Sequence, residues 1–202
     1  MEIDRIYYPV KTLGYGERIG IWTIGCPHGC KGCSNPELWG KDYTKNIRVE
    51  NIIEIIKGLG KKADGITITG GEPFYQSEEL NQLINRLNQL GYKDILIYTG
   101  YTYDELRSSN NTSINNIISK ISALIDGKYK EDLNDNRPLR GSSNQNLIIL
   151  NESYRHRYVI NGEMRAVQNV FYKDGLFSIG IPLKNFREDV NRALKDLGVS
   201  GD

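Results

Sequence analysis

Three cysteines are the residues of this sequence best suited to metal or redox chemistry. Cys26, Cys30 and Cys33 lie within one short segment, and no other position of the chain holds a cysteine. Three thiols cannot all pair with one another in disulfides. In a reducing compartment, cysteines at such close spacing are typical of a metal site or a redox site.

Four kinds of site are compatible with these cysteines. A zinc site could use all three together with His28, although structural zinc sites usually draw their ligands from two separated segments. A thioredoxin-like pair would use Cys30 and Cys33 and would leave Cys26 without a role. Buried structural thiols would be unusual beside glycines and a proline, which favour an irregular loop. An iron–sulfur cluster held by three thiolates would keep one iron open to a small molecule, as a catalytic metal site requires.

Alternating helices and strands place the cysteine segment within an α/β fold. A buried strand at 19–24 leads directly into the cysteines. Residue spacing then predicts, in order, a helix at 49–59, a strand at 64–69, a helix at 77–90, a strand at 94–98, short helices near 103–107 and 113–120, and a strand at 121–126. This alternation indicates βαβ units and a mainly parallel sheet.

Residues able to bind a ligand stand at the carboxyl ends of the predicted strands. After the cysteines come Gly70 and Gly71, then Thr99, and then Asp126, each at the end of a strand. Ligands of open parallel sheets bind beyond the carboxyl ends of the strands. We therefore expect these residues to converge at one edge of the sheet. Thr99 and Asp126 are equally compatible with simple cap or turn roles.

The last fifty residues differ in character from the rest of the chain. They predict strands at 156–160 and 166–172, a hairpin turn at Asp174-Gly175, and a final helix that begins after Asn185. We expect a small antiparallel β/α appendage packed beside the main sheet. The predicted division is a core at 1–150 and an appendage at 151–202.

Composition and charge narrow the classes of function. Hydrophobic residues make up 39% and charged residues 25%, which is ordinary for a globular protein. The formal net charge of +1 gives no excess of positive charge that would attract a polyanion, so we expect no nucleic-acid partner. No run approaches the roughly 18 apolar residues of a membrane span, and the first residues lack the apolar segment of a secretory signal. We expect a cytoplasmic protein without a membrane partner.

Several motifs resemble one enzyme family. The Cys-x3-Cys-x2-Cys spacing is similar to that of the radical S-adenosylmethionine enzymes. Further segments resemble the activating proteins of anaerobic ribonucleotide reductase, over about residues 7–146: YYPV at 7–10, GCPHGCKGCSNPELW at 25–39, TGGEP at 69–73, IYTGYTYDEL at 97–106, and DGKYKEDL followed by LRGSSNQ within 126–145. The fold that this resemblance implies is a partial barrel of the (β/α)6 type.

The resemblance also implies a cofactor set and its residues. Cys26, Cys30 and Cys33 would each bind one iron of a [4Fe-4S] cluster, and S-adenosylmethionine would chelate the fourth iron. The turn that would bind the methionine part consists of Gly70, Gly71, Glu72 and Pro73. Gly32, Cys33 and Ser34 would lie against the adenosine, and Thr99 and Asp126 could reach the ribose or the amino-acid part.

The function that the resemblance implies is activation of a partner enzyme. A 5′-deoxyadenosyl radical would remove hydrogen from a glycine of a glycyl radical enzyme, with the anaerobic ribonucleotide reductase large subunit as the favoured partner. A flavodoxin- or ferredoxin-type protein would donate the electron. The appendage keeps a second hypothesis open, a radical enzyme acting on a small molecule or a peptide. A non-enzymatic iron–sulfur or zinc protein is the third.

Overall fold

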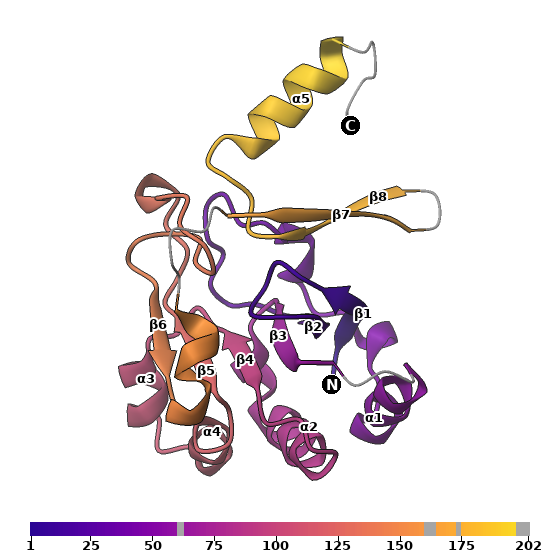
Figure 1. Cartoon of the computed structure of the whole chain (residues 1–202), viewed down its shortest axis with the longest axis vertical. Coiled ribbons are helices and arrows are strands. Elements are labelled where there is room, and N and C mark those ends of the chain that lie inside the picture. Colours follow the sequence, from indigo (N-terminus) through magenta and orange to yellow (C-terminus); the bar gives the residue numbers. More distant parts are fainter. Residues whose placement is uncertain (60–62, 160–164, 173–174, 197–202) are drawn as a thin grey trace.

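A six-stranded sheet forms the centre of the molecule in the computed structural model, which describes residues 1–59, 63–159, 165–172 and 175–196 (Figure 1). The strands lie across the sheet in chain order. They are β1 (Ile3–Val10), β2 (Arg18–Thr23), β3 (Gly65–Gly70), β4 (Ile95–Tyr98), β5 (Ala123–Asp126) and β6 (Asn146–Ile149). The predicted strands that correspond to β2–β5 are confirmed within one or two residues.

The sheet is parallel in its middle and antiparallel at its edges. Strands β2 to β5 run parallel, whereas β1 and β6 each run antiparallel to their neighbours. The predicted mainly parallel sheet is confirmed. The two outer strands were not predicted, because β1 has no clear apolar alternation and β6 is only 4 residues long. Among the described residues β1 and β6 do not pair with each other, so the sheet is open, and the expected partial barrel is not confirmed.

Four helices connect the strands and bury apolar stripes. They are α1 (Val49–Gly58), α2 (Ser77–Gln89), α3 (Tyr103–Ser108) and α4 (Thr112–Ile118), as the residue spacing predicts. In α2 the stripe consists of Leu80, Leu83, Ile84 and Leu87, and all four side chains are fully buried. They pack in one cluster with isoleucines of β2, β3 and β4. Each such side chain stabilises the fold by about 1.5–3 kcal/mol, so this packing fixes the strands whose ends carry the cysteines and glycines.

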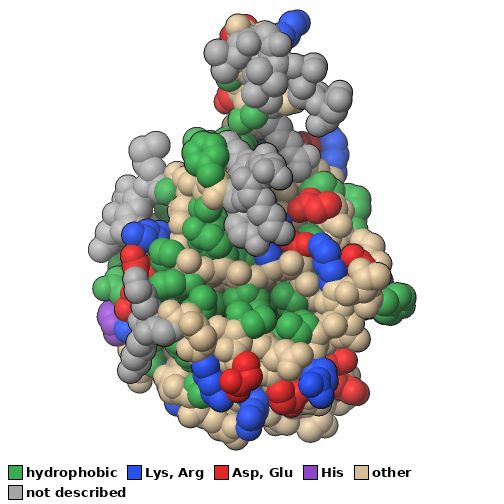
Figure 2. Space-filling view, turned by 90° about the vertical axis from the view of Figure 1, so that its right-hand side faces the viewer, with side chains coloured by type: hydrophobic (Ala, Val, Ile, Leu, Met, Phe, Trp, Pro, Cys, Tyr) green, Lys and Arg blue, Asp and Glu red, His purple; other side chains and the backbone are tan. Residues whose placement is uncertain are grey.

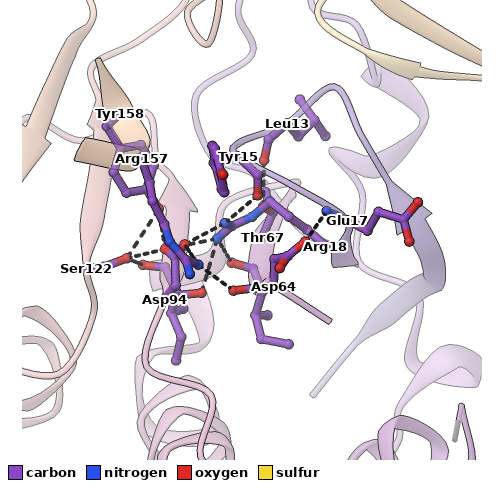
Figure 3. Close-up of polar contacts among 12 residues, drawn as sticks. Leu13, Tyr15, Glu17, Arg18, Asp64, Thr67, Asp94, Ser122, Arg157 and Tyr158 are labelled. Carbon is purple, nitrogen blue, oxygen red and sulfur yellow. Dashed lines mark hydrogen bonds and ion pairs between the residues drawn. The ribbon is translucent and has the colours of Figure 1, made fainter. Parts of the chain in front are cut away.

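A buried arginine joins the amino ends of the central strands, at the edge opposite the cysteines (Figure 3). The Arg18 side chain is fully buried. Its Nε donates to Thr67 Oγ1 at 2.7 Å, and its Nη1 donates to Asp94 Oδ2 at 3.0 Å. The third guanidinium nitrogen, Nη2, donates to the Ile66 carbonyl at 2.6 Å. Strands β2, β3 and β4 are thereby tied together by one side chain.

The Asp94 carboxylate also accepts hydrogen bonds from residues later in the chain. Ser122 Oγ and the Tyr158 hydroxyl donate to Oδ1 at 2.8 and 2.5 Å, and Arg157 Nη1 donates to Oδ2 at 3.0 Å. Burial alone would raise the pKa of Asp94. The charge and hydrogen bonds of Arg18, with the bonds from Tyr158 and Ser122, outweigh burial, so this pKa lies below its usual value.

The segment that carries Arg157 and Tyr158 corrects one prediction. Residues 156–160 were predicted as a strand, but Glu152–Tyr158 form a 3-10 helix, η5. The reason is tertiary: the helical turn allows both side chains to reach Asp94 together. Residue 160 lies outside the described residues. The division of the chain near residue 150 stays a prediction, and η5 packs on the main sheet although it follows that point.

The predicted C-terminal hairpin is confirmed as a separate two-stranded sheet. It consists of β7 (Val167–Tyr172) and β8 (Gly175–Gly180), followed by α5 (Phe186–Asp196). Asp174 of the predicted turn lies outside the described residues, and Tyr172 pairs with Gly175 beside it. In Figure 1 the hairpin crosses one end of the main sheet, and α5 extends away from the body of the molecule.

Apolar packing and hydrogen bonds attach the hairpin to β1 and β2. Ile179 is buried in a cluster with Val10, Leu13 and Trp22. The Gln168 side chain accepts a hydrogen bond from the Lys11 amide and donates one to the Pro9 carbonyl. The hairpin is therefore a packed part of the fold.

The face drawn in Figure 2 mixes both signs of charge. Basic and acidic side chains lie beside one another at its lower end and again at mid-height, and hydrophobic side chains lie across its middle. This distribution agrees with a net charge of +1. No helix among the described residues combines the length and the apolar character needed to cross a membrane.

Candidate functional site

A cavity of about 530 Å³ lies at the carboxyl ends of the central strands. Its walls include the cysteine loop after β2, the glycine turn after β3 and the end of β4. It brings together nine residues predicted from the sequence: Cys26, Cys30, Gly32, Cys33, Ser34, Gly70, Gly71, Glu72 and Thr99. Pro73 and Asp126 are not among the residues that line it. The expected convergence at one edge of the sheet is thus what the fold produces.

The cysteine loop can curve around a ligand because of its glycines. Gly25, Gly29 and Gly32 have φ angles of 89°, 57° and 73°, in the left-handed region that favours glycine. Between them, the Cys33 amide donates to the Cys30 carbonyl at 3.1 Å and closes a tight turn. This backbone directs three thiols from one short loop towards the same cavity.

The thiols suit a metal that displaces their protons. All three cysteines are partly buried and free of disulfides. Burial raises the pKa of both Cys26 and Cys30, so these thiols are protonated without a metal and must release protons when they bind one. Among the described residues, no three His, Cys, Asp or Glu side chains approach closely enough to share one metal ion. A cluster makes a different demand, because each thiolate binds its own iron. Three soft sulfur donors facing one cavity fit that demand.

Two glycines allow the turn after β3 to pass close to the cysteine loop. A Cβ atom on Gly71 would lie 2.5 Å from the Gly25 carbonyl oxygen. A Cβ on Gly70, whose φ is 102°, would lie 2.6 Å from the Thr23 backbone. The Gly71 amide donates to the Thr23 carbonyl at 2.7 Å and the Glu72 amide to the Gly25 carbonyl at 2.8 Å. The cysteine loop and the glycine turn are therefore one rigid unit.

The substitution Gly71→Ala tests this close approach. The new methyl group must displace the Gly25 backbone, and we expect the free energy of unfolding to fall by about 1–3 kcal/mol, the usual cost of forced overpacking. Iron content after reconstitution should fall as well. Gly40→Ala is the matched control, since no atom lies within 4 Å of a Cβ built there. Urea unfolding and iron analysis of both variants measure the effect, and equal values for the two would contradict it.

Glu72 links three parts of the site through a fully buried carboxylate. Its Oε1 accepts hydrogen bonds from the Phe74 amide at 3.0 Å and from Thr99 Oγ1 at 2.9 Å. The other oxygen accepts from the Gly100 amide at 2.7 Å and lies 3.0 Å from His28 Nε2. Sequence reasoning predicted a ligand contact here and missed this positioning role. His28 lies in the cysteine loop, and its contact with Glu72 connects that loop to the glycine turn. The His28 ring also packs edge-on against Tyr101.

Thr99 and Asp126 occupy turn and cap positions. Thr99 Oγ1 donates to Glu72 and accepts from the Tyr101 amide at 3.1 Å. Asp126 is buried, and its two oxygens accept from the Tyr103 amide at 2.8 Å and from the Asn146 amide at 3.1 Å. Both side chains thus have partners within the protein. Their predicted contacts with S-adenosylmethionine stay predictions.

The RGSSNQ segment holds another wall in place. Gln145 donates through Nε2 to the Gly127 carbonyl at 2.7 Å, and its Oε1 accepts from the Gly141 amide at 2.8 Å. Ser142 Oγ accepts from the Lys130 amide at 3.1 Å. The segment held in this way places Tyr129 on the cavity, beside Gly32. Tyr129 was not singled out from the sequence, where its only signal is its place between Asp126 and the RGSSNQ motif.

Comparisons with known proteins identify the family of the chain. The model of a family described as "4Fe-4S single cluster domain" matches residues 12–148. The anaerobic ribonucleoside-triphosphate reductase-activating protein of Enterobacteria phage T4 is 31% identical over 151 residues, which cover 73% of this chain and 93% of that protein. The protein of the same name from Escherichia coli (strain K12) is 35% identical over 148 residues, 69% of this chain and 93% of its own. A solved structure of QueE from Escherichia coli superposes with a TM-score of 0.43 and 25% identity over 50% of this chain and 52% of that one.

A match to a 4Fe-4S single cluster domain, in a chain with a three-cysteine loop and a glycine turn at the carboxyl ends of a parallel sheet, indicates a radical S-adenosylmethionine enzyme. The particular family follows from the identities over most of both chains. This chain belongs to the family of anaerobic ribonucleoside-triphosphate reductase-activating proteins.

Proposed function

We propose that this enzyme cleaves S-adenosylmethionine reductively and generates a glycyl radical on a partner, the large subunit of an anaerobic ribonucleotide reductase. The observation that carries the proposal is the meeting of the cysteine loop, the glycine turn and Thr99 in one cavity. Relatives at 31–35% identity that bear the name of activating proteins support the choice of partner.

In this proposal the chain's own residues bind and orient. Cys26, Cys30 and Cys33 would hold the cluster as thiolates and would leave one iron open for S-adenosylmethionine. When bound, the cluster supplies one electron that breaks a carbon–sulfur bond of the sulfonium and yields methionine and the 5′-deoxyadenosyl radical. Gly70 and Gly71, which line the cavity, would bind the methionine part through backbone groups, and the 32–34 segment would bind the adenosine.

Glu72 and its partners set the geometry. Because its carboxylate holds His28 and Gly100 at the same time, the cysteine loop and the end of β4 keep a fixed separation. Removal of one hydrogen atom from a glycine of the partner would then give 5′-deoxyadenosine and a glycyl radical. A flavodoxin- or ferredoxin-type donor supplies the electron.

The test is an anaerobic assay in two stages. Cluster-reconstituted protein, reduced by dithionite, should convert S-adenosylmethionine to 5′-deoxyadenosine. Addition of the reductase large subunit should then produce a glycyl radical visible by electron paramagnetic resonance, and a Gly→Ala change at the radical site of the reductase should remove that signal. Product formation without any glycyl radical would favour the second candidate, a radical enzyme for a small molecule or peptide. The observation behind that candidate is that the C-terminal appendage lines the cavity.

A further inference from the structure

The C-terminal appendage supplies a wall of the reaction cavity that the family model does not reach. Residues 181–186 line the cavity together with the cysteine loop. The family model ends at residue 148. The match to the Escherichia coli relative takes in 93% of that protein but 69% of this chain, so that relative has little sequence left to correspond to this wall.

One buried side chain fixes the wall in position. Arg165 is only 7% exposed, and its Nη1 donates to the Pro182 carbonyl at 2.7 Å and to Asn134 Oδ1 at 3.0 Å. Its Nε donates to the Arg137 carbonyl at 3.1 Å, and its Nη2 donates to the Arg140 carbonyl. A single guanidinium thus joins the 181–186 segment to the 134–141 loop, which forms another part of the cavity.

Further bonds support the same joint. The Lys184 amide donates to Asn136 Oδ1 at 2.8 Å. In the same loop Leu139 has a φ of 62°, a backbone conformation that leucine rarely adopts and that persists only where the surroundings hold it. Arg165 donates hydrogen bonds to carbonyls on both sides of Leu139, at Arg137 and Arg140. These hydrogen bonds therefore fix the 181–186 segment to the 134–141 loop.

A recess of about 210 Å³ lies between this wall and the sheet. Phe186 lines both the recess and the main cavity. The other lining residues are apolar or neutral, including Trp22 and Ile179, and none of them is Lys, Arg, Asp or Glu. Tyr98 also lines the recess, and its buried hydroxyl has no hydrogen-bond partner among the described residues. The recess is smaller than the roughly 300–1,000 Å³ of ordinary small-molecule pockets.

We propose that the appendage wall is a specificity surface for the partner's peptide segment, with Phe186 as its contact and Arg165 as its positioning residue. This inference rests on the proposed function and extends it. A neutral, narrow recess beside the radical site suits an uncharged peptide loop better than a charged nucleotide. Phe186 lines the same cavity as the cysteine loop, so a peptide segment bound in the recess beside Phe186 lies next to that cavity.

The experiment uses the full chain with its cluster reconstituted. Rates of glycyl radical formation are measured at several concentrations of the reductase large subunit, and each rate is normalised to the 5′-deoxyadenosine formed without reductase. Phe186→Ala should raise the KM for the reductase about tenfold, the effect of one buried aromatic contact at an interface, with little change in kcat. Phe171→Ala is the matched control, because Phe171 belongs to the same appendage, is 86% exposed and does not line the cavity.

The outcomes distinguish a failure of the appendage inference from a failure of the proposed function. If wild type forms a glycyl radical and Phe186→Ala has the same KM as Phe171→Ala, the appendage inference is overturned and the proposed function stands. If wild type forms no glycyl radical on the reductase, the proposed function fails, and the inference fails with it. A Phe186→Ala effect confined to 5′-deoxyadenosine formation would also overturn the inference.

Arg165→Lys provides a second variant. Lysine keeps the charge but cannot reach acceptors in both the 134–141 loop and the 181–186 segment at once. We expect the KM for the reductase to rise as it does for Phe186→Ala. In a double variant the two changes should not add, because they disturb one surface. Fully additive increases would contradict the positioning role.

Discussion

Cys30→Ala should reduce 5′-deoxyadenosine formation to the background of the assay. Loss of one of three thiolates leaves two irons of the cluster without protein ligands. Even the loss of an outer partner of a metal ligand lowers metal affinity by about 10–100-fold, so removal of a direct ligand should exceed that range. Iron and sulfide content, the visible absorption of the reconstituted protein and 5′-deoxyadenosine measured by chromatography give three independent readouts.

Lys31→Ala is the control for the cysteine variant. Lys31 stands between Cys30 and Cys33 in the sequence, but its side chain is 87% exposed and pairs with Glu131 at the surface. We expect normal iron content and normal product for Lys31→Ala. A Cys30→Ala protein that kept its iron and formed product would overturn the assignment of this residue. One tightly held zinc in place of iron would favour the zinc alternative instead.

Asp94→Asn should lower the free energy of unfolding by about 3–5 kcal/mol, the usual cost of breaking a buried ion pair. The amide has nearly the same volume as the carboxylate, but it leaves the fully buried Arg18 without a counter-charge. It also weakens the attachment of η5, because Arg157 and Tyr158 donate to the same carboxylate. Urea unfolding at pH 7, followed by circular dichroism, measures the loss.

A surface pair provides the control for the Asp94 variant. Glu54→Gln breaks the exposed pair between Lys57 and Glu54 and should cost no more than about 1 kcal/mol. A loss for Asp94→Asn as small as the loss for Glu54→Gln would show that the buried pair contributes little.

The loss of stability in the Asp94→Asn variant should depend on pH. The pKa of Asp94 is lowered in the folded protein, so the ionised carboxylate stabilises the fold above the unfolded value of about 3.9. This contribution disappears as the pH falls through the folded pKa. The difference in stability between wild type and Asp94→Asn should therefore be full at pH 7 and should shrink below about pH 4. A constant difference down to pH 3 would contradict the mechanism.

Local sequence patterns predicted the framework of the site well. Strong apolar periodicity in the 77–90 helix and short apolar runs such as 94–98 fixed the βαβ order. That order alone required the cysteines and the glycine turn to meet at one edge. The predictions succeeded where neighbouring residues determine the structure.

The failures concern contacts between distant residues. The 156–160 segment has the composition of a strand, but it is helical because Arg157 and Tyr158 bind a carboxylate 63 and 64 residues earlier in the chain. Glu72 lies within a recognisable motif, yet nothing nearby in the sequence indicates that His28, Thr99 and Gly100 from two other segments surround it. The part played by the appendage in the cavity depends on Arg165, an isolated arginine without any local signal.

The ion pair of Arg18 and Asp94 also has a consequence for the order in which the molecule is completed. Tyr158 is made 64 residues after Asp94, so at a ribosomal rate of about 5–20 residues per second the carboxylate waits roughly 3–13 s for its last donors. Arg165 and the 181–186 wall emerge later still. While the chain is being made, the side of the cavity that the 181–186 segment lines therefore stays open until that segment has been added.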